Sequence, residues 1–387
     1  MELIEVTSQT TEKQFLDIAR ILYKDDPVWV CPLDMDIRKI FNPALNAFYK
    51  DGNAIRWILK DDQGKLTGRI AAFYNRNKAN RYQQPTGGAG FFECINDQQA
   101  ASKLFDAASD WLDSQGMEAM DAPVNFGEND NFWGLLVEGF THPAYGMPYN
   151  HAYYQELFEN YGFKPYFTQI TKHLDLAVPF PERFWKIAGW VNKRPGYSFR
   201  HFTYKEADKF LHDLKEIYDQ AWVNHEHFVP LDIEVAKREL ESAKPILVED
   251  FIWFVYHEGK PVAFFVMYPD ANMIFRHFNG KMNLWNKLRF LYYKRTKEIT
   301  RLRQSMMGIV PKYQGMGLES ALFWHLQEPV LIKRPHITEM ELSWVGDFNP
   351  KMMATLEAVG AKPGKKHITY RRLFKDDNTF QQAKKIV

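Results

Sequence analysis

Apolar positions recur along the chain with two spacings, every second residue over short runs and every third or fourth residue over longer ones. The first spacing predicts strands and the second predicts helices. In the first half the predicted order is helix, two strands joined by a tight turn, strand, helix, strand, helix and strand: 11–22, 54–60, 66–75, 90–95, 98–114, 117–124, 152–161 and a strand that ends near 174. The second half predicts strand, two helices, two paired strands, strand, helix, strand, helix and strand: 197–203, 206–224, 232–242, 251–257, 261–268, 303–310, a helix from about 318, 338–345, 350–359 and 368–374.

The two halves share one plan, and their ends match most closely. In each half a helix is stopped by a glycine, Gly162 or Gly360, and a lysine follows two residues later, before the closing strand. We therefore predict an α/β fold (α+β, with mixed sheets) that contains two tandem copies of one domain. The alternative is two unrelated α/β layers that look alike because such layers are common.

Prolines and a glycine cluster between the two copies, as is usual where regular structure is interrupted. The predicted division is therefore a first domain at 1–176, a linker at 177–196 and a second domain at 197–387.

The composition excludes several classes of protein. The chain has 387 residues, of which 45% are hydrophobic and 25% charged, and its formal net charge of +1 argues against bulk attraction to DNA. Two cysteines, Cys31 and Cys94, cannot make a disulfide framework, and no metal-ligand spacing occurs. The sequence shows neither a signal peptide nor a transmembrane run, so we expect a cytoplasmic protein, with its oligomeric state open.

The segment 310–319 carries the most chemical information. An apolar run leads into a loop with Gly315 and Gly317, and a helical pattern follows. A strand, a glycine loop and a helix together form a typical phosphate site, because amide N–H groups and the positive end of the helix dipole face one point. The loop lacks the Lys-Ser/Thr pair of a P-loop and the three glycines of a dinucleotide fingerprint. An ordinary strand–turn–helix would have a similar local sequence.

The loop resembles the acetyl-CoA loop of the GCN5-related N-acetyltransferases (GNATs), whose signature is Gln/Arg-x-x-Gly-x-Gly/Ala. Gln314, Gly317 and the preceding Val310-Pro311 match that signature. Glu319 occupies its last position, where a carboxylate would oppose a bound pyrophosphate. The glycine-stopped helices of both halves are also similar to the end of a GNAT domain. The resemblance therefore implies two tandem GNAT-like domains with the acyl-CoA N-acyltransferase fold.

The resemblance further implies that the second copy binds acetyl-CoA or another acyl-CoA. Backbone groups of Ile309 and Val310 would pair with the pantetheine arm, and Asn349 would reach the same arm or cap the next helix. The loop amides would bind the pyrophosphate, and they belong to Gln314, Gly315, Met316, Gly317 and Leu318. The equivalent turn of the first copy lacks glycine and carries Glu93 and Asp97, so we expect a degenerate copy that does not bind CoA.

Acyl transfer to an amine needs a base for the amine proton, a donor for the thioester oxygen and an acid for the leaving thiolate. Glu341 is our candidate base, although a solvent-facing strand residue is the plainer interpretation. The tyrosine that GNAT domains often use as the acid is replaced by Leu356 in the second copy and by Phe158 in the first. The remaining candidate acids are Tyr313, Tyr370 and water.

Two segments are candidates for the acceptor site. Asn125 and Asn129 follow a predicted strand and stand among aromatic residues, as in pockets for polar substrates. His225 and His227 follow a helix in the region where GNAT domains recognise acceptors, and histidine titrates near neutral pH. An ordinary turn would suit either segment equally well.

The segment 270–303 is an insertion in which basic and aromatic residues alternate. Its basic residues face a single acid after Asp270, Glu298, and are Arg276, Lys281, Lys287, Arg289, Lys294, Arg295, Lys297, Arg301 and Arg303. A basic amphipathic helix of this kind is typical of contacts with RNA or with an anionic surface, and would also suit the 3′-phosphate of CoA. The plainer alternative is a helical arm that packs its aromatic side chains on the first domain.

The resemblance therefore implies an N-acyltransferase that moves an acyl group, expected to be acetyl, from acyl-CoA to an amine of a small molecule or peptide. Two other interpretations stay open. One is a tandem transferase similar to the aminoacyl-tRNA-dependent peptidoglycan enzymes, with RNA bound at the insertion. The other is a non-catalytic binding or scaffolding protein, which Glu319, Leu356 and Phe158 would suit.

Overall fold

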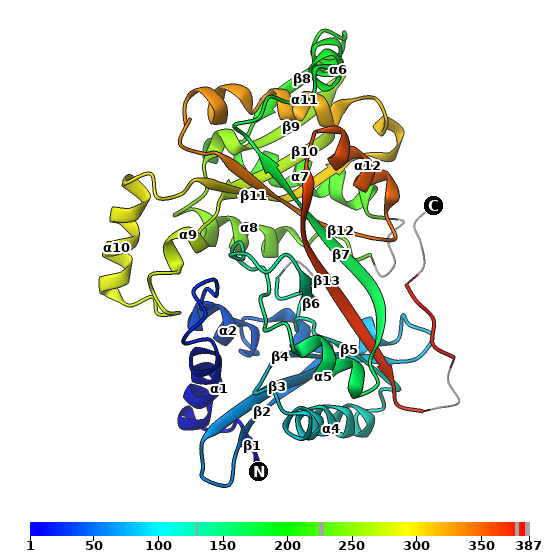
Figure 1. Cartoon of the computed structure of the whole chain (residues 1–387). Helices are drawn as coiled ribbons and strands as arrows, with labels where there is room; N and C mark the ends of the chain where they lie inside the picture. Colours follow the sequence, from blue (N-terminus) through cyan, green and yellow to red (C-terminus); the bar gives the residue numbers. More distant parts are fainter. Residues whose placement is uncertain (129–130, 224–227, 376–378, 384–387) are drawn as a thin grey trace. The chain divides into compact units, whose positions relative to one another are not determined.

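The chain folds into two compact units, each assembled from separate stretches of sequence (Figure 1). The computed structural model describes residues 1–128, 131–223, 228–375 and 379–383. The first unit contains Met1–Ile170, Ile274–Tyr293 and Lys365–Ala383, and the second contains Thr171–Met273 and Lys294–Gly364.

A mixed sheet forms the centre of the first unit. Its strands run in the order β1-β2-β3-β4-β5-β13, and β6 also pairs with β13. The strands are β1 Glu2–Glu5, β2 Gly52–Lys60, β3 Leu66–Asn75, β4 Thr86–Cys94, β5 Ala119–Ala122, β6 Leu135–Glu138 and β13 Lys362–Leu373. The helices include α1 Gln9–Leu22, α2 Asp34–Ile40, α3 Arg76–Ala79, α4 Gln98–Ser114 and α5 Tyr154–Asn160.

The second unit has a sheet of the same kind. Its strands run in the order β7-β12-β11-β10-β9-β8. They are β7 Lys164–Asp175, β8 Tyr197–His201, β9 Ile252–His257, β10 Lys260–Pro269, β11 Arg301–Ile309 and β12 Glu339–Gly346. The helices include α6 Glu182–Asn192, α7 Ala207–Ala221, α8 Ile233–Ala243, α11 Leu318–Trp324 and α12 Pro350–Ala358.

The two sheets repeat the same pairing, as the sequence plan predicts. In the first unit β3 is antiparallel to β4, and β4 runs parallel to β5. In the second unit β10 is antiparallel to β11, and β11 runs parallel to β12. The helices α4 and α11 make the two parallel crossovers. The mixed sheets confirm the predicted fold class.

The last strand of each half belongs to the unit that the other half builds. β13, from the C-terminal end, pairs with β5 and sets Arg371 opposite Asp121. These two buried residues form hydrogen bonds of 2.6 and 2.8 Å. In return, β7 belongs to the second unit from Thr171 onward and neighbours β12. The predicted boundaries at 176 and 197 follow the sequence repeat, whereas the compact units exchange these strands.

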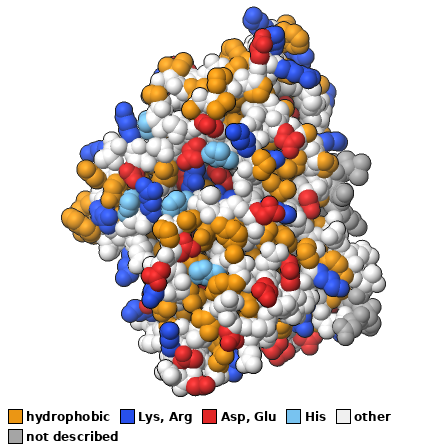
Figure 2. Space-filling view, viewed as in Figure 1, with side chains coloured by type: hydrophobic (Ala, Val, Ile, Leu, Met, Phe, Trp, Pro, Cys, Tyr) orange, Lys and Arg blue, Asp and Glu red, His pale blue; other side chains and the backbone are white. Residues whose placement is uncertain are grey.

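The segments that the sequence predicts as a linker and as an insertion both contain helices. The predicted linker, 177–196, contains α6, which packs Phe184 and Val191 into the core of the second unit. The insertion forms α9 Asn272–Phe275 and α10 Leu284–Arg295, and its residues Ile274–Tyr293 belong to the first unit. This placement agrees with the helical-arm interpretation. Where Figure 1 shows α10, Figure 2 shows apolar and basic side chains side by side.

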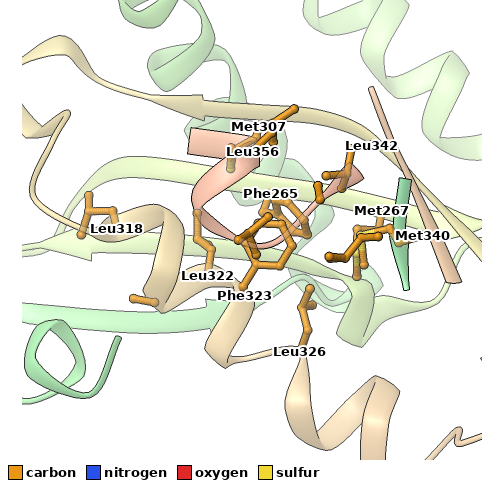
Figure 3. Packing of buried hydrophobic residues seen from close by; sticks show 14 of the residues in the cluster. Phe265, Met267, Met307, Leu318, Leu322, Phe323, Leu326, Met340, Leu342 and Leu356 are labelled. Carbon is orange, nitrogen blue, oxygen red and sulfur yellow. The ribbon is translucent and has the colours of Figure 1, made fainter. Parts of the chain in front are cut away.

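The largest core of the second unit lies where α11 covers the sheet. Figure 3 shows Leu318 and Phe323 of α11 in one cluster with Phe265 of β10 and Met340 of β12. Burying a side chain of this size contributes roughly 1.5–3 kcal/mol. Because Leu318 is the first residue of α11, this core fixes the start of the helix, and with it the end of the glycine loop.

The strand exchange predicts what a C-terminal truncation does. A chain that ends at Gly364 lacks the part of β13 that pairs with β5, so we expect the first unit to lose protection although the deletion lies at the far end of the sequence. Amide hydrogen exchange, measured residue by residue, should show β4 and β5 exchanging fast. A chain that ends at Lys375 keeps β13 and is the matched control. Full protection of β5 in the shorter chain would contradict the exchange.

Candidate functional site

The parallel strands β11 and β12 pair briefly and then separate. Their register joins Arg301, Leu302 and Arg303 to Glu339, Met340 and Glu341, and it ends there. In the first unit the register of β4 and β5 ends in the same way, at Gly88 and Asp121. Each unit therefore has a gap between two parallel strands, just before the crossover from one to the other.

The two gaps differ in width. In the first unit the backbone closes the gap, because the amide of Val124 donates to the carbonyl of Ala89 at 2.9 Å. In the second unit the amide of Ser343 donates instead to the side-chain oxygen of Gln304 at 3.0 Å. A buried side chain thus spans a distance that a direct backbone bond spans in the first unit, so the second gap is wider.

The backbone amide of Ile309 on β11 faces this wider gap. The N–H of Val310 donates to Val262 of β10 at 2.9 Å, so it is already used. Neighbouring backbone groups of a strand point to opposite sides, and the amide of Ile309 therefore points toward β12. The carbonyl of Ile309 accepts a hydrogen bond of 3.1 Å from the Gln314 side chain, which ties the loop to the gap. Of the two predicted partners for a pantetheine arm, Ile309 has the suitable direction.

The glycine loop lies at the surface between β11 and α11. Gln314, Gly315 and Met316 are exposed, and the hydroxyl of Tyr313 lies 3.3 Å from Nδ1 of His257. Gly315 and Gly317 have φ values of +71° and +81°, in the left-handed region that favours glycine. Gly317 is the N-cap of α11, so the loop leads directly into the helix, as the sequence pattern predicts.

Helix α6 approaches the loop on one side only. A Cβ atom at Gly317 would lie 2.4 Å from Cγ2 of Ile187, whereas a Cβ atom at Gly315 would meet nothing within 4 Å. Gly317 is therefore needed both for its backbone conformation and for its contact with α6. The open side of the loop is the side at Gly315.

Glu319 lies in the first turn of α11 and is partly buried. Burial raises the pKa of its carboxyl, although a hydrogen bond from its own backbone amide opposes that shift. This carboxyl thus takes up one of the amides at the start of the helix. Its position is consistent with the predicted opposition between Glu319 and a pyrophosphate.

A buried polar cluster lies where β11 and β12 separate. Glu341 is 3% exposed and accepts a hydrogen bond of 2.8 Å from the hydroxyl of Thr171 on β7. Arg303 stands opposite Glu341 in the strand register, and the neighbouring Arg301 contacts Asp270 at 2.6 and 2.8 Å. Burial lowers the pKa of Arg301, but Asp270 and the charge of Glu341 raise it overall. Glu341 is therefore a buried carboxylate beside cations, and not a solvent-facing strand residue.

Two other predicted residues have hydrogen-bond partners within the chain. Asn349 caps α12 by accepting the amide of Met352 at 3.2 Å, which confirms the cap interpretation. Tyr370 belongs to the first unit, where its hydroxyl donates to Glu159 at 2.9 Å. Burial and that carboxylate raise the pKa of Tyr370.

The predicted acceptor residues are only partly described. The side-chain amide of Asn125 donates to the carbonyl of Glu128 at 3.5 Å, as in an ordinary turn. Asn129, His225 and His227 lie outside the described residues. Among the residues that are described, no group of 3 or more His, Cys, Asp and Glu side chains is arranged to hold a metal ion.

In the first unit, Glu93 and Asp97 form hydrogen bonds with groups of the same unit. Glu93 is buried, lies 3.4 Å from Arg69 and accepts a hydrogen bond of 2.8 Å from Tyr154. Burial raises the pKa of Glu93, and the charge of Arg69 opposes the shift. Asp97 caps α4 by accepting the amide of Ala100 at 2.8 Å. The start of α4 therefore already holds a carboxylate of the chain itself.

Solved structures identify the fold as that of tandem GNAT domains. The chain is similar to a tandem GNAT protein from the clavulanic acid biosynthesis pathway, with a TM-score of 0.57 and 14% identity over 97% of this chain and 99% of that chain. It is also similar to a GCN5-related N-acetyltransferase from Sphaerobacter thermophilus, with a TM-score of 0.53 and 10% identity over 98% of each chain. This confirms the predicted recognition at the level of the fold.

Two curated proteins are similar to the chain over nearly its whole length. Protein YghO of Escherichia coli (strain K12) is 27% identical over 369 residues, which cover 93% of this chain and 92% of YghO. A bacterial ceramide synthase of Caulobacter vibrioides is 26% identical over 382 residues, which cover 96% of each protein. A scan against protein-family models finds no match.

The contact between Gly317 and α6 predicts a difference between the two loop glycines. An alanine at either position adopts a left-handed conformation that costs roughly 1–2 kcal/mol. Gly317→Ala should lower the free energy of unfolding further than Gly315→Ala, because only the former meets Ile187. Urea unfolding of both variants, each also with Ile187→Ala, measures the coupling. Equal losses at both glycines, with no coupling to Ile187, would contradict the close contact.

The raised pKa of Glu319 predicts a pH-dependent gain from Glu319→Gln. A carboxyl whose pKa is raised by folding favours the folded state below its ordinary value near 4.5 and loses that advantage as the pH rises through the raised value. The variant should therefore melt at a higher temperature than the wild type at pH 7.5, and the difference should shrink toward pH 4. Glu328→Gln, at an exposed carboxylate paired with Lys333, is the control that should show no such gain. A constant difference at all pH values would contradict the assignment.

Proposed function

We propose that the chain is an N-acyltransferase that moves a long acyl group from acyl-CoA to the amine of a long-chain lipid acceptor. The main support is the similarity of the chain, over 96% of each protein, to a bacterial ceramide synthase. A ceramide is an amide of a fatty acid and a long-chain amino alcohol, so that name points to N-acylation. The tandem GNAT fold suits the same reaction class. The proposal narrows the expected acceptor to lipids and favours an acyl group longer than acetyl.

The second unit is the proposed donor site, and the first unit is the proposed degenerate copy. The wider gap and the direction of the Ile309 amide suit an extended arm that pairs with β11. The open side at Gly315 suits a pyrophosphate, because no Cβ obstructs the backbone there. In the first unit, Val124 closes the gap, and the turn at 93–97 before α4 contains no glycine.

The buried cluster supplies a candidate base. The acyl-CoA thioester would supply the activated carbonyl group, and residues of the chain would carry out the proton transfers. Glu341, held by the Thr171 hydroxyl and opposite Arg303 in the strand register, would accept the proton that the amine loses. Another backbone amide of β11 beside the gap would donate to the carbonyl oxygen as charge develops there. One C–N bond forms, one C–S bond breaks, and Tyr313 beside His257 would return one proton to the sulfur.

A direct assay tests the proposal. Purified protein is incubated with acyl-CoAs from acetyl to palmitoyl, with a long-chain amino alcohol or a short polar amine as acceptor. We expect release of free CoA thiol, and an N-acylated lipid by mass spectrometry, with the long donor and the long acceptor only. Transfer of acetyl to the short amine would contradict the lipid assignment. The absence of both binding and turnover with every acyl-CoA would contradict the transferase itself.

The role of Glu341 predicts a change in the pH profile. Glu341→Gln keeps the shape of the side chain and removes its basicity, so kcat should fall by roughly 100-fold or more, the range typical of a lost general base. The acidic limb of the kcat–pH profile should disappear. Glu339→Gln, two residues away on the same strand face and partly exposed, is the matched control. A loss of thermal stability with an unchanged pH profile would make Glu341 a structural partner of the arginines.

A further inference from the structure

Helix α10 carries an apolar face that no described residue covers. The side chains of this face are 53–76% exposed, and they are Leu284, Trp285, Leu288, Leu291 and Tyr292. Their spacing of one, four, seven and eight residues from the first places them on one side of a helix. We call these five residues the α10 outer face. Single exposed apolar residues are common, whereas five on one face of a short helix are not.

The opposite side of α10 anchors the helix. Phe290 is buried and stacks on Phe275 with ring centroids 5.9 Å apart. Asn286 is also buried, and its side chain donates to the carbonyl of Lys281 at 2.7 Å. Arg289 donates to the carbonyl of His277 at 3.2 Å. The inner side thus has hydrogen-bond partners for its polar groups and buries its aromatic ring. This packing fixes the helix with its outer face exposed to solvent.

Exposed cations lie on the same helix and just beyond its ends. They are Lys281, Lys287, Lys294, Arg295 and Lys297, of which Lys294 also donates to the carbonyl of Pro245, and the segment 281–297 contains no acidic residue. The whole chain has a net charge of only +1, so this segment is a local concentration of positive charge. The combination of apolar and basic side chains is visible at α10 in Figure 2.

We infer that α10 binds an anionic phospholipid surface, with its outer face in the headgroup region and its cations toward the lipid phosphates. Leucines provide apolar area, and Trp285 and Tyr292 are of the amphipathic type that favours the membrane–water interface. Long basic side chains reach from the edge of such a face to the phosphates. No described helix is both long and apolar enough to cross a bilayer, and α10 would lie in the interface plane.

Two other occupants fit these residues less well. In a self-complementary dimer built on this face, two basic helices would face one another without acidic partners, and like charges repel. RNA would use the cations and could stack on the aromatic rings, but it offers nothing to the three exposed leucines. An anionic bilayer satisfies the leucines, the aromatic side chains and the charges together. The inference rests on α10 alone and does not require the proposed acyltransferase activity.

Vesicle flotation with the full-length chain tests the inference. The protein is mixed with vesicles of phosphatidylcholine alone or of phosphatidylcholine with phosphatidylglycerol. We expect flotation with the phosphatidylglycerol vesicles, weakened by salt. Trp285→Ser with Leu288→Ser should reduce the partition coefficient by about tenfold or more, because two apolar side chains no longer leave water. Lys287→Glu with Arg295→Glu should abolish the preference for phosphatidylglycerol.

Matched variants separate binding from damage to the fold. Leu45→Ser alters an apolar residue of the same unit that is similarly exposed, at 59%, and should leave flotation unchanged. Equal melting temperatures of all variants would show that the inner side of α10 still packs. Failure of the wild type to float on anionic vesicles would overturn the inference. A second result would also overturn it: no vesicle binding, together with a concentration-dependent dimer or RNA binding that Leu288→Ser removes.

Discussion

The separation of β11 from β12 is the constraint on which the candidate site depends. Parallel strands that stay paired satisfy each other's backbone groups, and strands that separate must find other partners for them. Here the side chains of Gln304 and Gln314 supply two of these partners, to Ser343 and to Ile309. The gap is therefore built into the fold by these side chains, and the Ile309 amide is directed into it.

The exchange of last strands explains why neither half of the chain is dispensable. Thr171 lies on β7, which is encoded by the first half of the sequence, yet its hydroxyl holds Glu341 in the second unit. Conversely, Arg371 comes from the last strand of the sequence and binds Asp121 in the first unit. A first copy without a phosphate loop therefore remains necessary, because it contributes a side chain that positions the candidate base.

The sequence predicts local structure well because side-chain periodicity reflects local geometry. The predicted strand at 66–75 and helix at 98–114 agree with β3 and α4. Pairing between distant segments leaves no such periodic signal, so the repeat suggests two sequential domains where the strands are in fact exchanged. The predicted linker contains a helix for a related reason: prolines mark the ends of α6, while its interior carries the apolar residues Phe184 and Val191.

In the candidate site, too, the sequence predicts some residues and not others. Gln314 and Gly317 are recognisable because the loop needs specific residues at fixed spacing. Thr171 and Arg303 could not be found from spacing, since they meet Glu341 only through strand pairing.

The two units share one fold, so a comparison between them separates what the fold determines from what individual residues determine. They share the same strand pairing and the same early end of the parallel register. They differ at the crossover, where the second unit has left-handed glycines and a side-chain bridge, and the first has an Asp97 cap and a backbone bond at Val124. A common fold thus accounts for the divergence of the strands but not for the wider gap. The difference between the copies therefore lies in a few residues at this crossover.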